Sequence, residues 1–300
     1  MFRNLRFYSF NIEWPSSEEQ LSDLLEQAAF TPCGPLTDRS SGWEAVFPDT
    51  SDLLARRLAG ADLLKLRSQS RILPAAAVDE ALQSRIDDFI SRMGEAPSTR
   101  EKRRMKAETR DELMPKAMLK SDRVWGYIDL KLKVIAVGTA QEAMAERFLR
   151  RLSAAFGALD VRPLGFNTPV IDLLTKVFLG GAPGQFVVGR ECRMQDLRDP
   201  ASIVRWSNFD LSDRSIRDHV AGGMRLTHLG IEYDNVMSCV VDENGTLTKM
   251  KFVGADAEAD ESDDPQARHD AEFALVSGTV RNLLQDLAKQ LGGFAAGSDS

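Results

Sequence analysis

Residues 75–123, AAAVDEALQSRIDDFISRMGEAPSTREKRRMKAETRDELMPKAMLKSDR, interrupt a chain of strands and helices with two long polar segments. In the first, Pro74 precedes an apolar stripe at helical spacing that ends at Gly94. After a break at Pro97, the second segment has neither Pro nor Gly from residue 99 to residue 114, and its composition favours a helix. We therefore expect a helical hairpin, with residues 75–93 packed against residues 99–114.

The second half of this stretch concentrates positive charge. Residues 100–123 hold nine cations and five carboxylates, a net charge of +4 in a protein whose net charge is −7. The cations are Arg100, Lys102, Arg103, Arg104, Lys106, Arg110, Lys116, Lys120 and Arg123. A basic segment in an acidic protein favours an anion-binding surface, with nucleic acid as the leading candidate. The alternative is a solvated helix with i,i+4 ion pairs, in which Glu108 and Glu112 face Arg104 and Lys116.

Length and composition predict a folded chain outside the membrane. The 300 residues are 43% hydrophobic, enough for a large core and roughly two domains. No window approaches the roughly 20 apolar residues that span a bilayer, and the first residues lack the apolar stretch of a signal peptide, so we expect a cytoplasmic protein. Cys33, Cys192 and Cys239 are far apart in sequence, which is typical of reduced thiols.

Strand and helix patterns flank the hairpin on both sides. Before it, we expect a strand over residues 2–10, a helix capped by Ser16 or Ser17, an irregular stretch over residues 35–52 and a strand over residues 63–66. After it, we expect strand over residues 124–137, then a helix whose capping box pairs Thr139 with Glu142. Further on, a loop-rich region surrounds an amphipathic run, residues 170–179. Strands over residues 225–233, 236–241 and 246–253 follow, and a closing helix contains residues 273–291.

This order predicts an α+β chain with antiparallel sheets. We expect a first subdomain from residues 1–74 and 124–165, a helical basic insertion of residues 75–123, and a second subdomain of residues 166–300. A Rossmann fold is excluded because strands and crossover helices do not alternate and no G-x-G-x-x-G follows the first strand.

No catalytic motif is present in the sequence. A Walker loop, a nucleophile elbow, an H-E-x-x-H motif and an H-x-E motif with a downstream cysteine pair are all absent. We therefore expect a protein that is not an enzyme and needs no cofactor or metal. One alternative stays open, because Glu232, Asp234 and Asp242 lie near the ends of predicted strands, where a metal-dependent nuclease would hold a divalent cation.

Several short stretches are distributed along the whole chain. They are Phe2 to Leu5, Ala29 to Gly34 with Gly42-Trp43, Ile72 to Pro74, Trp125 to Asp129, Asn167 to Pro169, Asp210-Leu211, Leu226 to Phe252 and Leu291 to Gly293. In their order and spacing, these stretches resemble the RdgC family of recombination-associated proteins. The resemblance implies an elongated subunit that forms a ring-shaped homodimer, with a basic central hole that encircles double-stranded DNA. It also implies binding with little sequence preference, a location on the nucleoid and restraint of the RecA recombinase.

The resemblance also implies which residues face DNA. Lys116, Lys120 and Arg123 match the family's DNA-facing segment, in a loop before Trp125 in which Met118 replaces an aromatic residue. Arg205 opens a second matching loop, where Asn208 replaces a lysine and Phe209 replaces a polar residue. With the cations of the predicted helix, the candidate DNA-binding residues are Arg100, Lys102, Arg103, Arg104, Lys106, Lys116, Met118, Lys120, Arg123, Arg205, Asn208 and Phe209.

Two points stay open in this interpretation. Single-stranded DNA is an additional candidate ligand beside the duplex. The acidic segment of residues 255–264 also suggests a protein that binds the recombinase directly, in place of one that competes with it for DNA.

Overall fold

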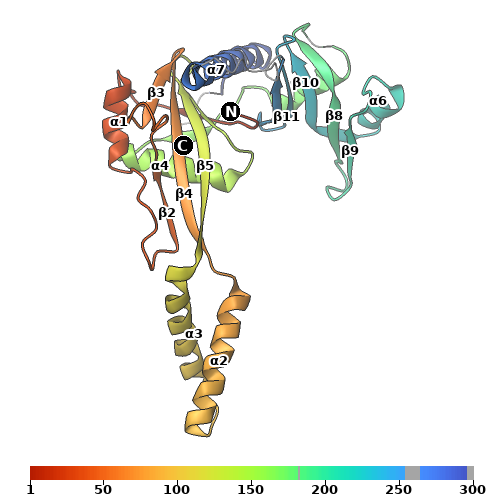
Figure 1. The fold of residues 1–300 in the computed structure, drawn as a ribbon. Coiled ribbons are helices and arrows are strands. Elements are labelled where there is room, and N and C mark those ends of the chain that lie inside the picture. Colours follow the sequence, from red (N-terminus) through yellow and green to blue (C-terminus); the bar gives the residue numbers. More distant parts are fainter. Residues whose placement is uncertain (182, 254–263, 296–300) are drawn as a thin grey trace. The chain divides into compact units, whose positions relative to one another are not determined.

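The computed structural model describes residues 1–181, 183–253 and 264–295, and within them the architecture is mixed α+β (Figure 1). This confirms the predicted fold class and its antiparallel sheets. The acidic segment, residues 255–264, lies outside the described residues except for Asp264.

Two antiparallel sheets contain the strands. The first has the order β2-β4-β5-β6-β1-β7, with β3 paired to β4, and the second has the order β12-β11-β10-β8-β9. The first comprises β1 (Arg6–Phe10), β2 (Arg39–Trp43), β3 (Ala55–Leu58), β4 (Ala61–Ile72), β5 (Met118–Asp129), β6 (Val134–Val137) and β7 (Val161–Pro163). The second comprises β8 (Phe186–Asp196), β9 (Ile203–Ser207), β10 (Met224–Tyr233), β11 (Met237–Asp242) and β12 (Leu247–Phe252).

Seven α-helices and one short 3-10 helix lie in the described part of the chain. They are α1 (Glu18–Glu26), α2 (Ala75–Met93), α3 (Thr99–Leu113), η1 (Met114–Lys116), α4 (Glu142–Phe156), α5 (Val170–Phe178), α6 (Arg214–Ala221) and α7 (Pro265–Gln290). Among these helices, none has the length and apolar character needed to cross a bilayer.

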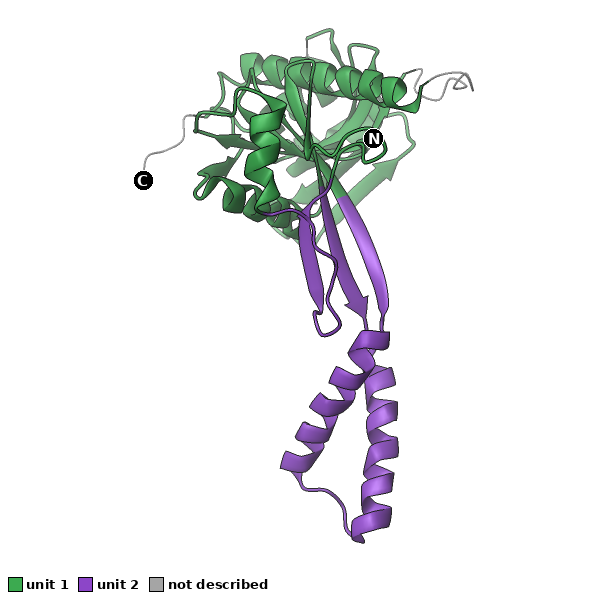
Figure 2. Ribbon diagram, turned by 60° about the vertical axis from the view of Figure 1, so that its left-hand side comes forward, with its two compact units in different colours: residues 1–27, 45–65, 124–300 green, residues 28–44, 66–123 purple. Residues whose placement is uncertain are grey.

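The chain divides into two compact units (Figure 2). Unit 1 contains residues 1–27, 45–65 and 124–300, and unit 2 contains residues 28–44 and 66–123. Strands β4 and β5 contribute residues to both units. Unit 2 consists of a three-stranded ribbon from β2, β4 and β5 that continues into the hairpin of α2 and α3. The subdomain boundaries expected from the sequence stay a prediction.

Helix α7 packs its apolar face into the main core of unit 1. Its buried apolar residues belong to one core that contains Tyr127 of the first sheet as well as Leu229 and Val241 of the second. Phe273 meets the ring of Tyr127 edge-on, with centroids 5.7 Å apart. Because each large apolar side chain that is fully buried contributes roughly 1.5–3 kcal/mol, this helix holds both sheets of the unit to one core.

The structure corrects several element predictions before the second sheet. Residues 35–52 are not all irregular, because β2 forms at residues 39–43. Gly42 in this strand lets the backbone of Ala29 come close, since a Cβ there would lie 2.5 Å from it. Because glycine is rare inside strands, the sequence pattern did not indicate one here. Strand β4 is longer than residues 63–66, and β5 begins well before residue 124. Thr139 does not cap α4, because Gln141 is the N-cap and makes no side-chain bond there.

In the second half, the sequence analysis predicted a loop-rich region and missed strands β8 and β9 and helix α6. Glycines and prolines between residues 180 and 200 obscured the two strands, whose alternation is also weakened by polar residues on both faces. The three predicted strands of this half are confirmed as β10, β11 and β12. The predicted hairpin through Asn244-Gly245 is confirmed as well, with Gly245 at φ +76°.

A buried ion pair joins α7 to the first sheet. Arg281 Nε donates to Asp129 Oδ2 at 2.5 Å, and Arg281 Nη2 donates to the carbonyl of Ala59 at 3.0 Å. The Asp129 side chain is 3% exposed, so its charge depends on this partner and on the N–H groups of Lys131 and Leu132.

We predict that Arg281→Ala lowers the free energy of unfolding by about 3–5 kcal/mol, because a buried carboxylate loses its counter-ion. Urea unfolding followed by circular dichroism measures the change. The exposed Lys289→Ala serves as the control and should change stability by less than about 0.5 kcal/mol. Equal effects in the two variants would contradict the role given to this pair.

Candidate nucleic-acid interface

The helical hairpin of unit 2 forms as the sequence predicts. Helix α3 begins with a capping box, in which Ser98 accepts from the N–H of Glu101 and the Glu101 carboxylate accepts from the N–H of Ser98. Helix α2 ends at Gly94, which has the left-handed φ of +75° that favours glycine. Local capping therefore defines both ends of the turn between the helices.

Charged side chains link α2 and α3 across the hairpin. Lys106 Nζ lies 2.7 Å from Asp79 Oδ1, and Arg85 pairs with Glu112. Few side chains are buried between the helices: α2 buries Val78, and α3 buries Thr109. The hairpin is therefore a largely solvated surface.

The cations of α3 differ in how strongly they are neutralised. Lys106 pairs with Asp79, Arg110 with Asp38 at 2.8 Å, and Arg104 with Glu108 at 3.5 Å. Arg100, Lys102 and Arg103 are exposed and form no ion pair with any described residue. The first turn and a half of α3 thus offers three uncompensated positive charges.

The ion-pair alternative holds only in part. The i,i+4 pair of Arg104 with Glu108 is present, whereas Glu112 faces Arg85 of α2 and Lys116 is unpaired within the described residues. The carboxylates therefore neutralise the second half of α3 more than its first half.

Lys116, Met118, Lys120 and Arg123 do not form the predicted loop. Lys116 ends η1, and the other three lie in strand β5, where pairing with β4 extends a regular structure that sequence alternation did not show. Met118 is 77% exposed, and Lys120 forms an exposed pair with Asp122 at 3.1 Å. Strand geometry places Lys120 and Asp122 on one face and Ser121 and Arg123 on the other.

Arg123 is already bound to a carboxylate. Its Nε and Nη2 donate to the two oxygens of Glu44 at 2.6 and 3.2 Å, and Arg67 donates to the same group at 3.1 Å. The hydrogen bond to Glu44 raises the pKa of Arg123. Arg123 is therefore less available to a phosphate than Lys116 or the exposed cations of α3.

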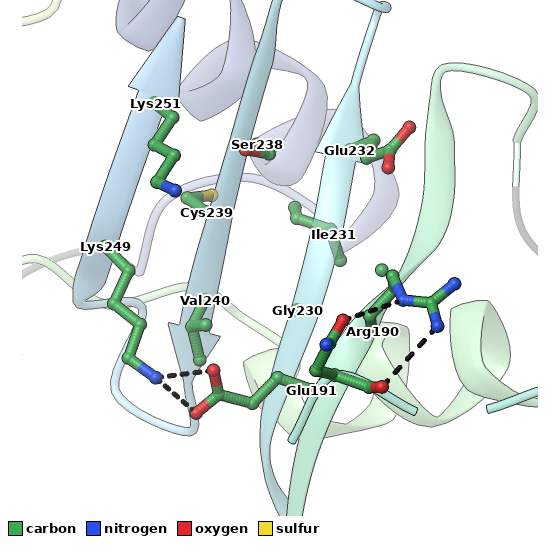
Figure 3. Close-up of a pocket in the computed structure, with 12 residues that line it drawn as sticks. Arg190, Glu191, Gly230, Ile231, Glu232, Ser238, Cys239, Val240, Lys249 and Lys251 are labelled. Carbon is green, nitrogen blue, oxygen red and sulfur yellow. Dashed lines mark hydrogen bonds and ion pairs between the residues drawn. The ribbon is translucent and has the colours of Figure 1, made fainter. Parts of the chain in front are cut away.

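A second set of cations lies on the second sheet of unit 1 (Figure 3). Arg205, which the sequence placed in a loop, lies in strand β9 and donates to Glu191 at 2.7 Å. Lys249 of β12 donates to the same carboxylate at 2.6 Å. Burial alone would raise the pKa of Glu191, but the hydrogen bonds from Lys249 and Arg205 outweigh it and lower the pKa. The trio keeps one net positive charge.

A hollow of about 330 Å³ lies beside this trio, lined by Arg190, Lys249 and Lys251 among others. Gly189 and Gly230 line it and are closely packed, because a Cβ on Gly189 would lie 2.8 Å from the carbonyl carbon of Gly230. Asn208 Oδ1 accepts from Arg190 Nε at 3.2 Å at the edge of the hollow. Phe209 follows and is 47% exposed.

The predicted site residues therefore fall into two groups. Those from Arg100 to Arg123 lie in unit 2, whereas Arg205, Asn208 and Phe209 lie on unit 1. Sequence reasoning missed Arg190, Lys249 and Lys251. The alternation of Lys249 and Lys251 in a predicted strand was the available signal, because it places both on one face.

The nuclease alternative gains no metal site from the geometry. Among the described residues, no group of three or more His, Cys, Asp or Glu side chains could hold a metal ion. Asp242 Oδ1 instead accepts the N–H groups of Asn244 and Thr246 and so fixes the hairpin turn. Burial raises the pKa of Cys192 to about 11 and that of Cys239 to about 12, so both thiols are protonated at neutral pH.

Comparison with known proteins gives one consistent answer over nearly the whole chain. Residues 1–294 match the family model described as "Putative exonuclease, RdgC". The chain belongs to the RdgC family. Similar proteins named "Recombination-associated protein RdgC" include those of Xanthomonas campestris pv. campestris, 31% identical over 96% of this chain and 97% of the relative, and of Halorhodospira halophila, 30% identical over 99% of both. A third, from Tolumonas auensis, is 28% identical over 98% of this chain and 99% of the relative.

The resemblance to the RdgC family, inferred from short stretches of the sequence, is thereby confirmed. The family description names an exonuclease, whereas the names of the relatives refer to an association with recombination. The exposed cations of α3 and of the second sheet fit the binding of an anion.

We predict that Gly189→Ala lowers the free energy of unfolding by about 1–3 kcal/mol, because the new methyl group overlaps the backbone of Gly230. Gly184→Ala is the matched control, since no described atom lies within 4 Å of a Cβ there. Urea unfolding of both variants measures the difference. If Gly189→Ala were as stable as the control, the tight packing below the hollow would be refuted.

Proposed function

We propose that this member of the RdgC family binds double-stranded DNA without sequence specificity, encircles it as a ring-shaped homodimer and restrains RecA-dependent recombination. The observation that carries the proposal is the row of exposed, unpaired cations at the start of α3 in a protein of net charge −7. Names of relatives over the full chain support the connection with recombination.

The charge arrangement suits a phosphate backbone better than base edges. Arg100, Lys102 and Arg103 lie on a solvated helix, and Lys116 follows at the end of η1. Contacts of such side chains with phosphate oxygens release counter-ions and carry no sequence information. Exposed pairs such as Lys106 with Asp79 are worth at most about 1 kcal/mol, so DNA can replace the carboxylate at little cost.

An incompletely buried apolar stripe on α2 supports the homodimer. Ile90 is 39% exposed and Met93 is 62% exposed, although both belong to the stripe at helical spacing. A second copy of the chain would remove these side chains from water. The same copy would double the number of cations that face one duplex, which explains how moderate charge in one chain can give useful affinity.

In this proposal, the protein restrains RecA because it occupies the DNA that the recombinase would use. A ring on duplex DNA excludes other proteins from the enclosed segment, so no direct contact with the recombinase is required. The alternative, direct binding through residues 255–264, predicts that deletion of this segment abolishes inhibition while DNA affinity is unchanged.

The first prediction concerns salt dependence. Combined replacement of Arg100, Lys102 and Arg103 by Gln should weaken binding to unrelated duplexes alike. The slope of log affinity against log salt should become shallower by about 5 if both chains of a dimer contact DNA, or by about 3 if one does. Fluorescence anisotropy with random-sequence blunt duplexes over a salt series measures both quantities.

The matched control for this experiment replaces Lys131, Lys133 and Lys289 by Gln, which removes the same charge from unit 1. An equal change of slope in the control would show that net charge, and not α3, determines binding. Incubation of the same DNA with Mg²⁺ or Mn²⁺ in the wild-type arm tests the nuclease alternative, which requires strand cleavage.

The second prediction concerns ring closure. Complexes formed on circular DNA should survive a jump to high salt much longer than complexes on the same DNA after linearisation, because a closed ring leaves linear DNA by sliding off its ends. Retention of protein on beads that carry either DNA measures this, and light scattering should show twice the mass of one chain. Equal release from the two DNAs would contradict encirclement and leave binding intact.

A further inference from the structure

A pocket lined by aromatic rings lies in unit 1, and none of the candidate DNA-binding cations lines it. Its volume is about 510 Å³, and it is formed by the loop that contains Phe47, by Trp125 of β5 and by the first turns of α7. The proposed contacts with phosphate use none of these residues. Several features of the pocket therefore need another explanation.

Three rings make the apolar wall of this aromatic pocket. The His269 ring lies edge-on to Phe47 with centroids 4.9 Å apart, and is tilted against Trp125 with centroids 5.4 Å apart. All three side chains are half-buried, so each keeps some exposed surface. Lys65 Nζ lies 5.3 Å from the Trp125 centroid and helps to fix that ring.

His269 is polar but has no polar anchor. Its Nδ1 is buried and has no hydrogen-bond partner among the described residues, so contacts with rings hold the imidazole in place. Burial lowers the pKa of His269, more than the carboxylates of Glu272 and Asp270 raise it. The ring is consequently neutral near pH 7 and offers a flat aromatic surface without a charge.

The lining of the aromatic pocket also contains polar groups. Gln266 can both donate and accept hydrogen bonds, and Arg268 is a cation. Asp49 contributes a carboxylate, and Asp264 accepts from the N–H of Gln266 as the N-cap of α7. The carboxylates disfavour a phosphate in the pocket, whereas Arg268 favours one near its own side chain.

We propose that the aromatic pocket binds one unpaired nucleobase, at a DNA end or in a single strand, while the adjoining phosphate lies near Arg268. This proposal rests on the proposed function, because it assigns a second element of the same ligand. A nucleobase fits the combination of three aromatic rings, one of them a neutral imidazole, with the amide of Gln266. Stacking of a base on aromatic side chains is favourable and tolerant of sequence.

The chemistry of the base explains why an unpaired nucleotide is required. In a duplex, each base is held by stacking on its neighbours and by pairing with the opposite strand, so only an unpaired base is free to enter the pocket. A single-nucleotide overhang therefore gains an interaction that a blunt duplex of equal length does not. This contribution does not depend on neutralised phosphates, so it should persist when salt is raised.

The experiment compares a blunt duplex with the same duplex carrying a one-nucleotide overhang of 2-aminopurine. Wild-type full-length protein should bind the overhang duplex about tenfold more tightly, which corresponds to about 1.4 kcal/mol. The fluorescence of the 2-aminopurine should change on binding as the base stacks. Phe47→Leu should abolish most of the preference and leave the affinity for the blunt duplex unchanged.

Phe166→Leu is the matched control, since Phe166 is a half-buried ring that contacts Phe294 outside the aromatic pocket. It should retain the tenfold preference. Circular dichroism before and after heating shows whether either variant is unfolded, and His269→Leu replaces Phe47→Leu if the latter is.

Two results would overturn the proposal: no preference and no 2-aminopurine signal in the wild type, or a full preference in folded Phe47→Leu. Failure of the proposed function has a different signature, namely absence of binding to the blunt duplex. In that event, a 2-aminopurine single strand tests the pocket directly, and quenching of tryptophan fluorescence supports it, whereas the absence of both optical changes refutes it.

Discussion

The packing of α7 into a core shared by two sheets is the constraint on which unit 1 depends. Its apolar face is buried along most of its length. The ion pair of Arg281 with Asp129 adds a directional contact, which fixes the position of α7 along the first sheet more precisely than apolar packing does. Both sheets pack on this one helix. The strands that carry the Lys249–Glu191–Arg205 trio and the residues that line the aromatic pocket are therefore held in place. The hairpin of unit 2 lacks such a core and relies on capping, ion pairs and the ribbon that carries it.

Elements with a strong apolar period could be predicted from the sequence, whereas those defined by close backbone contacts could not. The stripes of α2, α4 and α7 and the strands β10 to β12 have clear periods, and the Asn-Gly hairpin has a clear turn signal. Strand β2 is polar and depends on Gly42, whose missing Cβ admits the backbone of Ala29. Strand β8 likewise contains Gly189, which allows the backbone of Gly230 to pack closely. The glycines that allow these strands to pair therefore also weaken the sequence pattern that would predict a strand.

The candidate site was predictable where charge is local in sequence. The cations of α3 lie within eleven residues, from Arg100 to Arg110, so the sequence alone groups them. Arg123 is paired with Glu44, which is distant along the chain. Arg205 is paired with Glu191, which also binds Lys249, and both of these residues belong to other strands. No pattern in one sequence specifies these partners, because the register of a folded sheet creates them.

The proposed surfaces of this protein use two interactions with different dependence on conditions. In this proposal, cations at the start of α3 would bind phosphate with release of counter-ions, so their contribution would fall steeply as salt rises. The aromatic pocket would bind a base by stacking, which salt screens little. Because stacking depends little on salt, the proposed preference for unpaired ends over blunt duplex would stay nearly constant while the total affinity falls as salt rises. Ionic strength would then change how tightly the protein binds DNA, and much less the ratio of its affinities for unpaired ends and duplex interiors.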